Sequence, residues 1–398
     1  MKKRVLLSSM LLTSALTSPS LMAAETLTEA LTTGKVSLDM NLRYEDVDQE
    51  TTDGEALTLR SRLGYNTADF MGFSARLEVE DVSIVGGVDD YIAPPAGKVT
   101  PAGHSVIADA EVTEIDQSYL QYKQGWATAI LGRQVIALDN QRFVGHVGWR
   151  QDRQTFDGFR TMLSPLEGLT VDLGYIDRRR RIFAENADID SEDYLFNVGY
   201  VTPFGKVVVY DYELDNQDAD IQYSNLGASF TGSVDIDAVK LLYAVEFATQ
   251  ERETKTTSFD TDYKKLELGT TVSGVTAKLG YEALGSDDGQ MGFQTPLATL
   301  HAFNGWADIF LVTPNVGLVD TYVSVGGSVA GFGLLAVYHE FEADEASATV
   351  DDLGDELDLQ VTRVFTENYS AGIKYAAYTA GDINQDTDKL WVWFTVKF

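Results

Sequence analysis

Hydrophobic and polar residues alternate without interruption over the last nine positions of the chain. The apolar face comprises Leu390, Val392, Phe394, Val396 and Phe398, and the opposite face comprises Trp391, Trp393, Thr395 and Lys397. Alternation with a period of two is the spacing of side chains along a β-strand. The pattern therefore predicts a strand that has one continuous apolar face and ends on an aromatic residue.

The same alternation recurs along the whole chain. It predicts eighteen strands, near residues 35–46, 55–67, 71–84, 111–123, 126–137, 152–164, 168–182, 192–202, 205–214, 220–231, 234–250, 258–273, 274–285, 316–328, 332–343, 354–365, 368–380 and 387–398. The even-numbered connections are short turns, such as 202–205 and 231–233, whereas the odd-numbered ones include the long segments 85–110 and 286–315. Short turns at one end and long loops at the other are typical of outer-membrane barrels.

Residues 1–24 have the features of a signal peptide. A basic start, Met1-Lys2-Lys3-Arg4, precedes a mostly apolar stretch and then small residues up to Ala24. No later segment approaches the roughly 20 consecutive apolar residues of a membrane helix. A chain in lipid without such helices satisfies its backbone polar groups only as a closed barrel. We therefore expect an exported all-β protein, in which residues 25–398 form a transmembrane antiparallel up-and-down β-barrel of about 18 strands.

The composition agrees with this interpretation. A hydrophobic content of 44% and a mean hydropathy of −0.11 resemble those of a soluble protein, but in a barrel only alternate residues face lipid. The chain has no cysteine, so stability must come from the strand ladder and not from disulfides. A net charge of −31 excludes nucleic acid as a partner, because such binders need a basic surface. The acidic residues either share divalent cations with lipopolysaccharide or serve solubility.

Alternation also assigns the side chains that line the lumen. The inward-facing arginines are Arg43, Arg60, Arg62, Arg76 and Arg160, and the inward-facing carboxylates are Glu45, Glu78, Glu80, Asp172, Glu213, Glu246, Glu267 and Glu282. An arginine fork binds a carboxylate in a planar, bidentate way and keeps its charge. Two interpretations are open: the arginines bind a passing anionic solute, or they pair with carboxylates on neighbouring strands and stiffen the wall.

Several stretches share residues with a known family. They are Leu42-Arg43-Tyr44-Glu45, residues 57–65, Leu131-Gly132-Arg133-Gln134, Thr155-Phe156-Asp157-Gly158-Phe159-Arg160, residues 301–308 and Ala336-Val337-Tyr338-His339. In this order and spacing they resemble the alginate-export family of Gram-negative outer-membrane barrels. The resemblance runs over nearly the whole mature chain.

The resemblance implies a passive channel for an anionic polyuronate or related solute. Its lumen would be lined by Arg43, Arg60, Arg62, Arg76 and Arg160, together with Glu78 and Glu80. Implied partners are outer-membrane lipids and lipopolysaccharide, the barrel assembly machinery, periplasmic chaperones and a hydrophilic, anionic saccharide. Transport would depend on pore radius and lining charge, with no cofactor and no catalysis. Two alternatives are a general diffusion porin for small hydrophilic nutrients and a surface receptor or adhesion barrel.

A run of four arginines, Arg178-Arg179-Arg180-Arg181, ends the seventh predicted strand near the outer rim. Alternation places Arg178 and Arg180 inward, where they would attract anions to the pore mouth. It places Arg179 and Arg181 outward, toward lipopolysaccharide phosphates. The run therefore predicts both an anion attractor and a lipid anchor.

An acidic segment in the last outer loop spaces oxygen ligands at alternate positions, as calcium loops do. The candidate ligands are Asp382, Asn384, Asp386 and Asp388. The segment lacks the central glycine and the distant bidentate glutamate of a helix-loop-helix calcium site. A calcium ion in the outer loop is therefore a hypothesis that rests on spacing alone.

Two further expectations concern chemistry and the pore. The four histidines lie far apart without metal-ligand spacing, and only His339 beside Glu340 offers a candidate for an outer-membrane hydrolase. Residues 85–110 contain too many glycines and prolines for a strand and form too long a segment for a simple hairpin. We expect that segment to fold into or over the lumen and to narrow it.

Overall fold

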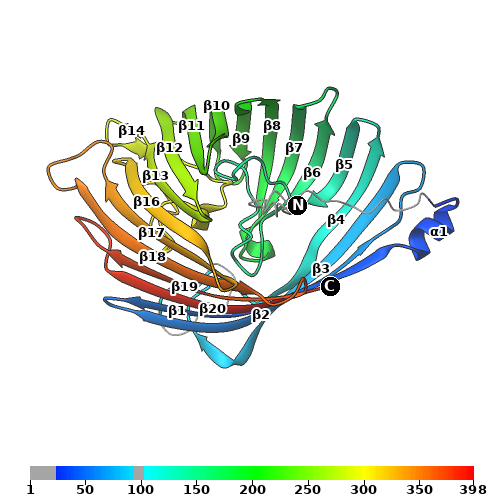
Figure 1. Ribbon diagram of the computed structural model, residues 1–398, viewed down its shortest axis with the longest axis horizontal. Helices are drawn as coiled ribbons and strands as arrows, with labels where there is room; N and C mark the ends of the chain where they lie inside the picture. Colours follow the sequence, from blue (N-terminus) through cyan, green and yellow to red (C-terminus); the bar gives the residue numbers. More distant parts are fainter. Residues whose placement is uncertain (1–23, 94–102) are drawn as a thin grey trace, which may run out of the picture.

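Neighbouring strands along the chain pair in antiparallel register, and the last strand closes onto the first (Figure 1). The structure is a computed structural model that describes residues 24–93 and 103–398. The predicted signal peptide therefore lies outside the described residues, except for Ala24. Eighteen strands form one closed sheet, which confirms both the strand number and the antiparallel barrel predicted by alternation.

The first half of the barrel follows a short helix. The elements are α1 (Leu27–Thr32), β1 (Lys35–Gln49), β2 (Asp53–Asn66), β3 (Phe73–Asp90), β4 (Val112–Gln124), β5 (Ala127–Gln134), β6 (Thr155–Leu163), β7 (Leu169–Arg180), β8 (Ile189–Thr202) and β9 (Gly205–Asn216). A 3-10 helix, η1 (Glu185–Ala187), lies between β7 and β8. Thr26 begins α1 by accepting a hydrogen bond from the Glu29 amide at 3.1 Å.

The second half contains the remaining wall strands and a small hairpin. The elements are β10 (Ile221–Ile236), β11 (Val239–Thr254), β12 (Ser258–Val272), β13 (Val275–Leu284), β14 (Ser286–Asp287), β15 (Met291–Gly292), β16 (Leu318–Val329), β17 (Phe332–Glu342), β18 (Asp352–Val364), β19 (Tyr369–Thr379) and β20 (Thr387–Lys397). Strands β14 and β15 pair only with each other, within a loop that also holds η2 (Leu300–Ala302). No helix among the described residues is long and apolar enough to cross a membrane.

Barrel closure rests on the pairing of β1 with β20, from Asp39 opposite Lys397 to Gln49 opposite Thr387. Beyond the strand end, Leu38 and Phe398 exchange two backbone hydrogen bonds, at 3.0 and 2.8 Å. The last nine residues, with their uninterrupted alternation, thus belong to the strand that closes the barrel against β1. Closure removes the open edges that would otherwise leave backbone groups unpaired in lipid.

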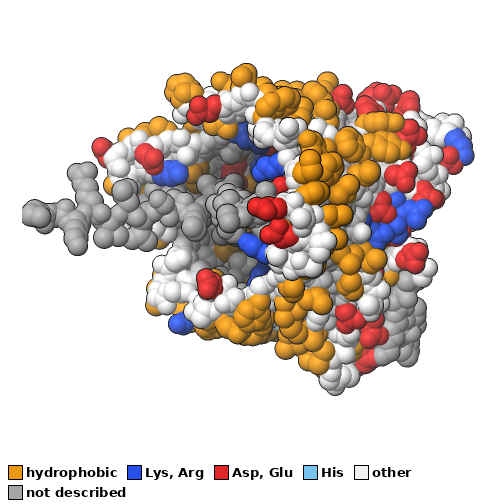
Figure 2. Space-filling view, turned by 90° about the vertical axis from the view of Figure 1, so that its right-hand side faces the viewer, with side chains coloured by type: hydrophobic (Ala, Val, Ile, Leu, Met, Phe, Trp, Pro, Cys, Tyr) orange, Lys and Arg blue, Asp and Glu red, His pale blue; other side chains and the backbone are white. Residues whose placement is uncertain are grey.

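The outer wall is apolar because alternate side chains point away from the lumen. Leu63, for example, is 57% exposed, whereas its neighbour Arg62 is buried. Figure 2, which looks toward the end of the molecule that carries α1, shows bands of hydrophobic side chains on the outer wall and a hollow bordered by Lys and Arg side chains. The exposed apolar side chains have lipid as their solvent.

One predicted turn is displaced. The sequence predicted a turn at 231–233, but β10 continues through these residues and turns after Ile236, where Asp237 has a φ of 53°. Gly232 is needed for another reason: a Cβ there would collide with the Tyr243 ring. This glycine therefore marks a close approach inside a strand rather than a turn.

Side-chain directions were predicted wrongly on two strands, β9 and β7. Glu213 was expected inside, but Tyr212 and Leu214 are the buried residues of β9 and Glu213 is exposed. In the run 178–181, Arg178 and Arg180 were expected inside and Arg179 and Arg181 outside, but a register shift between Ile176 and Arg178 reverses this alternation. Arg179 is consequently buried and forms two hydrogen bonds with Asp193. A β-bulge adds one residue to a strand, so every side chain beyond it changes face.

Candidate functional site

Two long loops fold into the lumen and form a core inside the barrel. They are the β5–β6 loop (135–154) and the β13–β16 loop (285–317), green and yellow in Figure 1. The loops pair with each other through backbone hydrogen bonds from Gly145 to Leu297 at 2.8 Å and from Thr299 to Gln141 at 3.0 Å. They bury apolar side chains against the inner wall, as an ordinary protein core does. The lumen is therefore constricted by ordered, packed loops.

On one side of the barrel the contact between loop and wall is aromatic. The Phe143 ring of the β5–β6 loop lies 4.9 Å from the ring of Tyr210 on β9 and 5.4 Å from that of Tyr263 on β12. Phe293 of the β13–β16 loop joins them at 5.9 Å. These distances fall in the favourable range for aromatic pairs. The buried tyrosines explain why β9 turns its apolar face inward and Glu213 outward.

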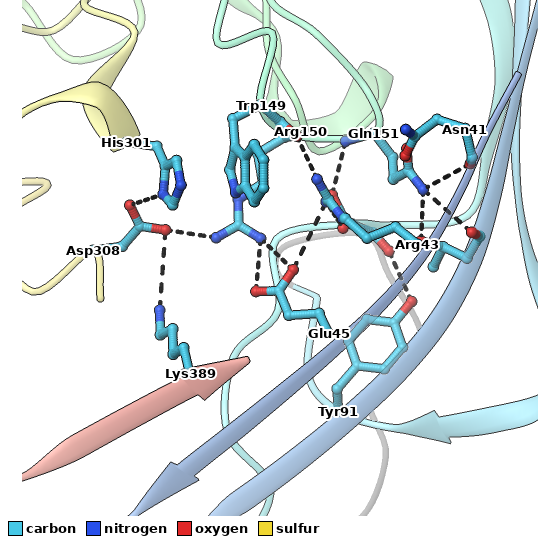
Figure 3. Close-up of polar contacts among 12 residues, drawn as sticks. Asn41, Arg43, Glu45, Tyr91, Trp149, Arg150, Gln151, His301, Asp308 and Lys389 are labelled. Carbon is cyan, nitrogen blue, oxygen red and sulfur yellow. Dashed lines mark hydrogen bonds and ion pairs between the residues drawn. The ribbon is translucent and has the colours of Figure 1, made fainter. Parts of the chain in front are cut away.

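On the opposite side the contact is ionic, and Arg150 lies at its centre (Figure 3). Its guanidinium donates to both carboxylate oxygens of Glu45 on β1, at 3.0 and 2.9 Å, and to Asp308 of the β13–β16 loop at 2.6 Å. Burial opposes the charge of Arg150, but the two carboxylates outweigh burial and raise its pKa. One side chain thus joins both loops to the first strand.

Asp308 also contacts His301, whose ring stacks on Trp149 with centroids 4.5 Å apart. Burial lowers the pKa of His301 to about 3, although Asp308 at 2.8 Å opposes this shift. The imidazole is therefore neutral near pH 7, so its Nδ1–H donates to Asp308 and its Nε2 accepts from the Lys374 ammonium at 3.0 Å. Lys374 lies over the rings of Trp149 and Trp306, at 3.9 and 4.1 Å.

The described part of the β3–β4 loop reaches the same region. Asp109 pairs with Arg43 and accepts a hydrogen bond from the Gln151 amide at 2.9 Å. Tyr91 donates its hydroxyl proton to the Asp109 carbonyl at 2.7 Å. Residues 94–102, part of the segment expected to narrow the lumen, lie outside the described residues. Residues 103–110 therefore contribute to the constriction, alongside the two loops that the sequence did not single out.

The arginines proposed as lining residues lie on the inner wall, and each has a carboxylate partner. Arg43 pairs with Asp109, Arg60 with Asp39, Arg62 with Glu80, Arg76 with Glu78 and Arg160 with Asp172. The structure brings Glu78 and Glu80 close together, because Arg153 of the β5–β6 loop contacts Glu78 and Asp116 while Arg62 contacts Glu80 and Asp116. Arg160 lies apart, in its own pair with Asp172. Four of these ion pairs connect different strands or a strand and a loop, whereas Arg76 and Glu78 both lie on β3.

Two arginines that the sequence did not propose as lining residues lack such partners. Arg181 and Arg252 line a cavity of about 440 Å³ at the outer end of the lumen, and neither forms an ion pair within the described part of the chain. Among the described residues, the Arg252 guanidinium donates only to the Tyr223 hydroxyl, at 3.4 Å. Extending the alternation of its strand past residue 250 would have placed Arg252 inward. Arg181, expected outward, was missed because the bulge in β7 cannot be read from alternation.

Three of the four arginines in the run 178–181 form ion pairs. Arg178 pairs with Asp190, Arg179 with Asp193, and Arg180 with both Asp157 and Asp188. Arg181 is the member whose guanidinium forms no ion pair among the described residues, although its backbone amide donates to Asp188 at 3.0 Å. Burial and the nearby Arg179 lower its pKa, as a cation with a like-charged neighbour requires.

The four calcium candidates do not converge. Asp382 accepts hydrogen bonds from the amides of Asp351 and Asp352, at 2.9 and 3.1 Å. Asp386 accepts one from the amide of Ala380 at 2.8 Å, and Asn384 and Asp388 are exposed. Within residues 24–93 and 103–398, no three His, Asp or Glu side chains are grouped to hold a metal ion. The carboxylates instead order the ends of neighbouring outer loops.

The two residues of the hydrolase candidate, His339 and Glu340, lie on opposite faces of β17. His339 is buried on the inner face and contacts Asp320 at 2.9 Å, whereas Glu340 is exposed on the other face of β17. Adjacent strand residues point to opposite faces. His339 and Glu340 therefore cannot act together on one substrate.

Comparisons with known proteins agree with this architecture. A family model described as alginate export matches residues 35–285, and no curated protein matches the chain. Pseudomonas aeruginosa OccK9 (OpdG) has a TM-score of 0.74 at 15% identity, covering 93% of this chain and 100% of that one. Acinetobacter baumannii OccAB4 has a TM-score of 0.71 at 14% identity, covering 91% and 98%. Pseudomonas aeruginosa OpdK, solved with vanillate, has a TM-score of 0.71 at 13% identity, covering 92% and 98%.

Proposed function

Because the chain belongs to the alginate-export family of outer-membrane barrels, we propose that it is a passive channel for small organic anions that carry carboxylates, such as acidic saccharides. The chain resides in the bacterial outer membrane as a porin-type barrel. Arg181 and Arg252 would provide the first contacts for the solute. Arg150 would hold the constriction behind them.

The observation that carries this proposal is that the outer cavity contains two guanidinium groups that form no ion pair among the described residues. The other arginines of the inner wall named above have carboxylate partners, whereas Arg181 and Arg252 have none among the described residues. A guanidinium in a partly enclosed site binds a carboxylate through charge-assisted hydrogen bonds. A local positive field can attract anions even when the net charge of the whole chain is −31.

The size of the cavity favours small solutes. A volume of about 440 Å³ lies in the range of small-molecule sites. A polymer chain would have to displace the loops that cross the lumen, and those loops are held by a buried core and by Arg150. Acidic sugars and short oligomers therefore fit better than a long polyuronate. Vanillate, with which the OpdK structure was solved, is a small carboxylate anion, as are the solutes proposed for this channel.

Planar-bilayer reversal potentials in a KCl gradient would test the proposal. We expect anion preference in the unaltered protein and a loss of that preference in the double variant Arg181→Ala with Arg252→Ala. Arg178→Ala is the matched control, because Arg178 belongs to the same run but pairs with Asp190 at 2.5 Å. Cation preference that the double variant leaves unchanged would overturn the proposal and favour a general diffusion porin.

A further inference from the structure

We propose that the lumen contains a second solute site, on the periplasmic side of the segment 300–308, which binds a carboxylate attached to a hydroxylated ring. This inference rests on the proposed function, because it concerns the same solute after it has left the outer cavity. In this second site the solute would contact Lys265 on β12. None of the arginines discussed above lines this site.

The site is a cavity of about 330 Å³. Its wall is formed by β12, β13, β16 and β17 near their short turns, and its cover is formed by residues 302–306 of the β13–β16 loop. Leu300, His301 and Asp308 border the outer cavity instead. The segment 300–308 therefore separates two cavities, one toward the outer loops and one toward the periplasmic turns.

The carboxylates of this cavity already have partners. Glu282 pairs with Arg142 at 3.0 Å, Glu267 with Lys278 at 3.0 Å, and Asp320 with His339 at 2.9 Å. Lys265 forms no ion pair with any residue that the structure describes, and its Nζ lies 5.8 Å from the centre of the Phe303 ring. Glu246, Glu267 and Glu282 attract the Lys265 ammonium electrostatically, but none forms an ion pair with it, so a solute carboxylate can bind it without breaking an existing pair.

The remaining lining groups define the rest of the ligand. Glu267 receives one donor on each oxygen, from Lys278 and from the Tyr322 hydroxyl at 2.7 Å. A carboxylate oxygen can accept a further hydrogen bond, so Glu267 can bind a solute hydroxyl but repels a second carboxylate. Phe303, Trp306, Leu335 and Val337 supply an apolar side. A ring that carries both hydroxyls and one carboxylate, as an acidic sugar does, satisfies all three features.

The probe for this site is glucuronate, added to one side of a bilayer at a time. Glucose, which lacks the carboxylate, and benzoate, which lacks the hydroxyls, are the comparison solutes. Thr256→Cys reports the orientation of the barrel, because Thr256 lies in an exposed outer loop of a chain without cysteine. An impermeant thiol label then identifies the outer side.

We expect Lys265→Ala to raise the glucuronate concentration that half-blocks current from the periplasmic side by about tenfold, the loss expected for one charge-assisted hydrogen bond. Block from the outer side should change much less. Lys265→Arg should restore most of the periplasmic block. Lys264→Ala is the matched control, because Lys264 is the next residue but faces outward and pairs with Asp262 at 2.9 Å. Heat-modifiable migration on gels verifies that each variant is folded.

The outcomes distinguish this inference from the proposed function. If Arg252→Ala alters outer-side block while Lys265→Ala leaves periplasmic block unchanged, the anion channel stands and the second site is refuted. If benzoate blocks from the periplasmic side as well as glucuronate does, the requirement for hydroxyls is refuted. If no anion blocks from either side and the current is cation-selective, the proposed function fails first.

Discussion

The Arg150 guanidinium binds both carboxylate oxygens of Glu45, at 3.0 and 2.9 Å, and thereby fixes an inward-folded loop to the first strand of the barrel. Both side chains are buried. Removing one member of a buried pair leaves the other charge without compensation. The pair therefore determines whether the constriction stays in place.

We expect Glu45→Gln to loosen the β5–β6 loop, because Arg150 would keep only Asp308 as a charged partner. The change should destabilise the folded barrel by about 1.5–3 kcal/mol and increase open-channel current noise. Thermal unfolding followed by gel mobility, together with single-channel recording, would measure both effects. Glu50→Gln is the control, since Glu50 is exposed at the end of the same hairpin. Equal noise in the two variants would contradict the role assigned to the pair.

We expect Asp152 to make the constriction sensitive to pH. Burial, followed by the nearby Glu80 and Glu114, raises the pKa of Asp152 well above its usual value. An acid whose folded-state pKa is raised contributes its full stability below the unfolded pKa, and that contribution is lost as pH rises through the folded pKa. The carboxylates that interact with Asp152 are Glu80, Glu114 and Asp116. Arg62 and Arg153 pair with two of these carboxylates, Glu80 and Asp116.

We therefore expect current noise and conductance to rise with pH as Asp152 ionises beside Glu80. Asp152→Asn imitates the protonated acid and should remove this pH dependence. Glu167→Gln, at an exposed periplasmic turn, serves as the control. A pH dependence that persists in Asp152→Asn would assign the effect to another group.

The buried pair of Arg62 with Glu80 leads to a prediction about stability rather than selectivity. We expect Arg60→Ala combined with Arg62→Ala to destabilise the barrel by about 3–5 kcal/mol, because the buried Glu80 would lose Arg62 and Asp39 would keep only Lys397. Anion preference should change less than in the variant that lacks Arg181 and Arg252. Denaturation midpoints and reversal potentials separate the two effects. If the double variant folds but has lost its anion preference, Arg60 and Arg62 contact the solute after all.

Gly305 is required where the β13–β16 loop meets the wall. Its φ is 85°, and a Cβ at this position would collide with the Glu356 carboxylate. Glu356 also accepts a hydrogen bond from the Ala307 amide at 2.7 Å. We expect Gly305→Ala to displace the segment 300–308, lower the unfolding temperature and alter conductance. The cost should exceed about 1 kcal/mol.

Gly289→Ala is the matched control for Gly305→Ala. Gly289 has a φ of 69°, but its Cβ position faces open space. Both variants carry backbone strain, and only Gly305→Ala adds the collision. Comparable losses of stability in the two variants would mean that strain alone, and not docking against Glu356, explains the glycine.

A substitution at Phe398 tests the junction between β1 and β20 that closes the barrel. Its backbone pairs with Leu38, and its ring lies 5.9 Å from the Tyr369 ring. We expect Phe398→Asp to reduce the amount of folded protein in the outer membrane, because a charge on the lipid face of the closing strand is unfavourable. Phe398→Tyr should assemble normally. Heat-modifiable protein in outer-membrane fractions provides the measurement, and wild-type levels of Phe398→Asp would refute the prediction.

The sequence by itself determined the wall. Strand positions, the count of eighteen and the closing strand follow from alternation, because lipid on one side and polar surroundings on the other impose a period of two. Arg43, Arg62 and Glu80 are on the inner face for this reason. A local rule suffices here, since each strand residue faces one of only two environments.

Only the tertiary structure decided what the lumen contains. Tyr210 and Tyr212 face inward because Phe143 from a distant loop packs on them, and alternation alone cannot distinguish an apolar face toward lipid from one toward such a loop. The bulge in β7 is likewise invisible to a period of two. It left Arg181 in the outer cavity and buried Arg179 against Asp193. Which arginines remain unpaired depends on contacts between residues far apart in the chain, and those contacts form only when the loops fold into the barrel.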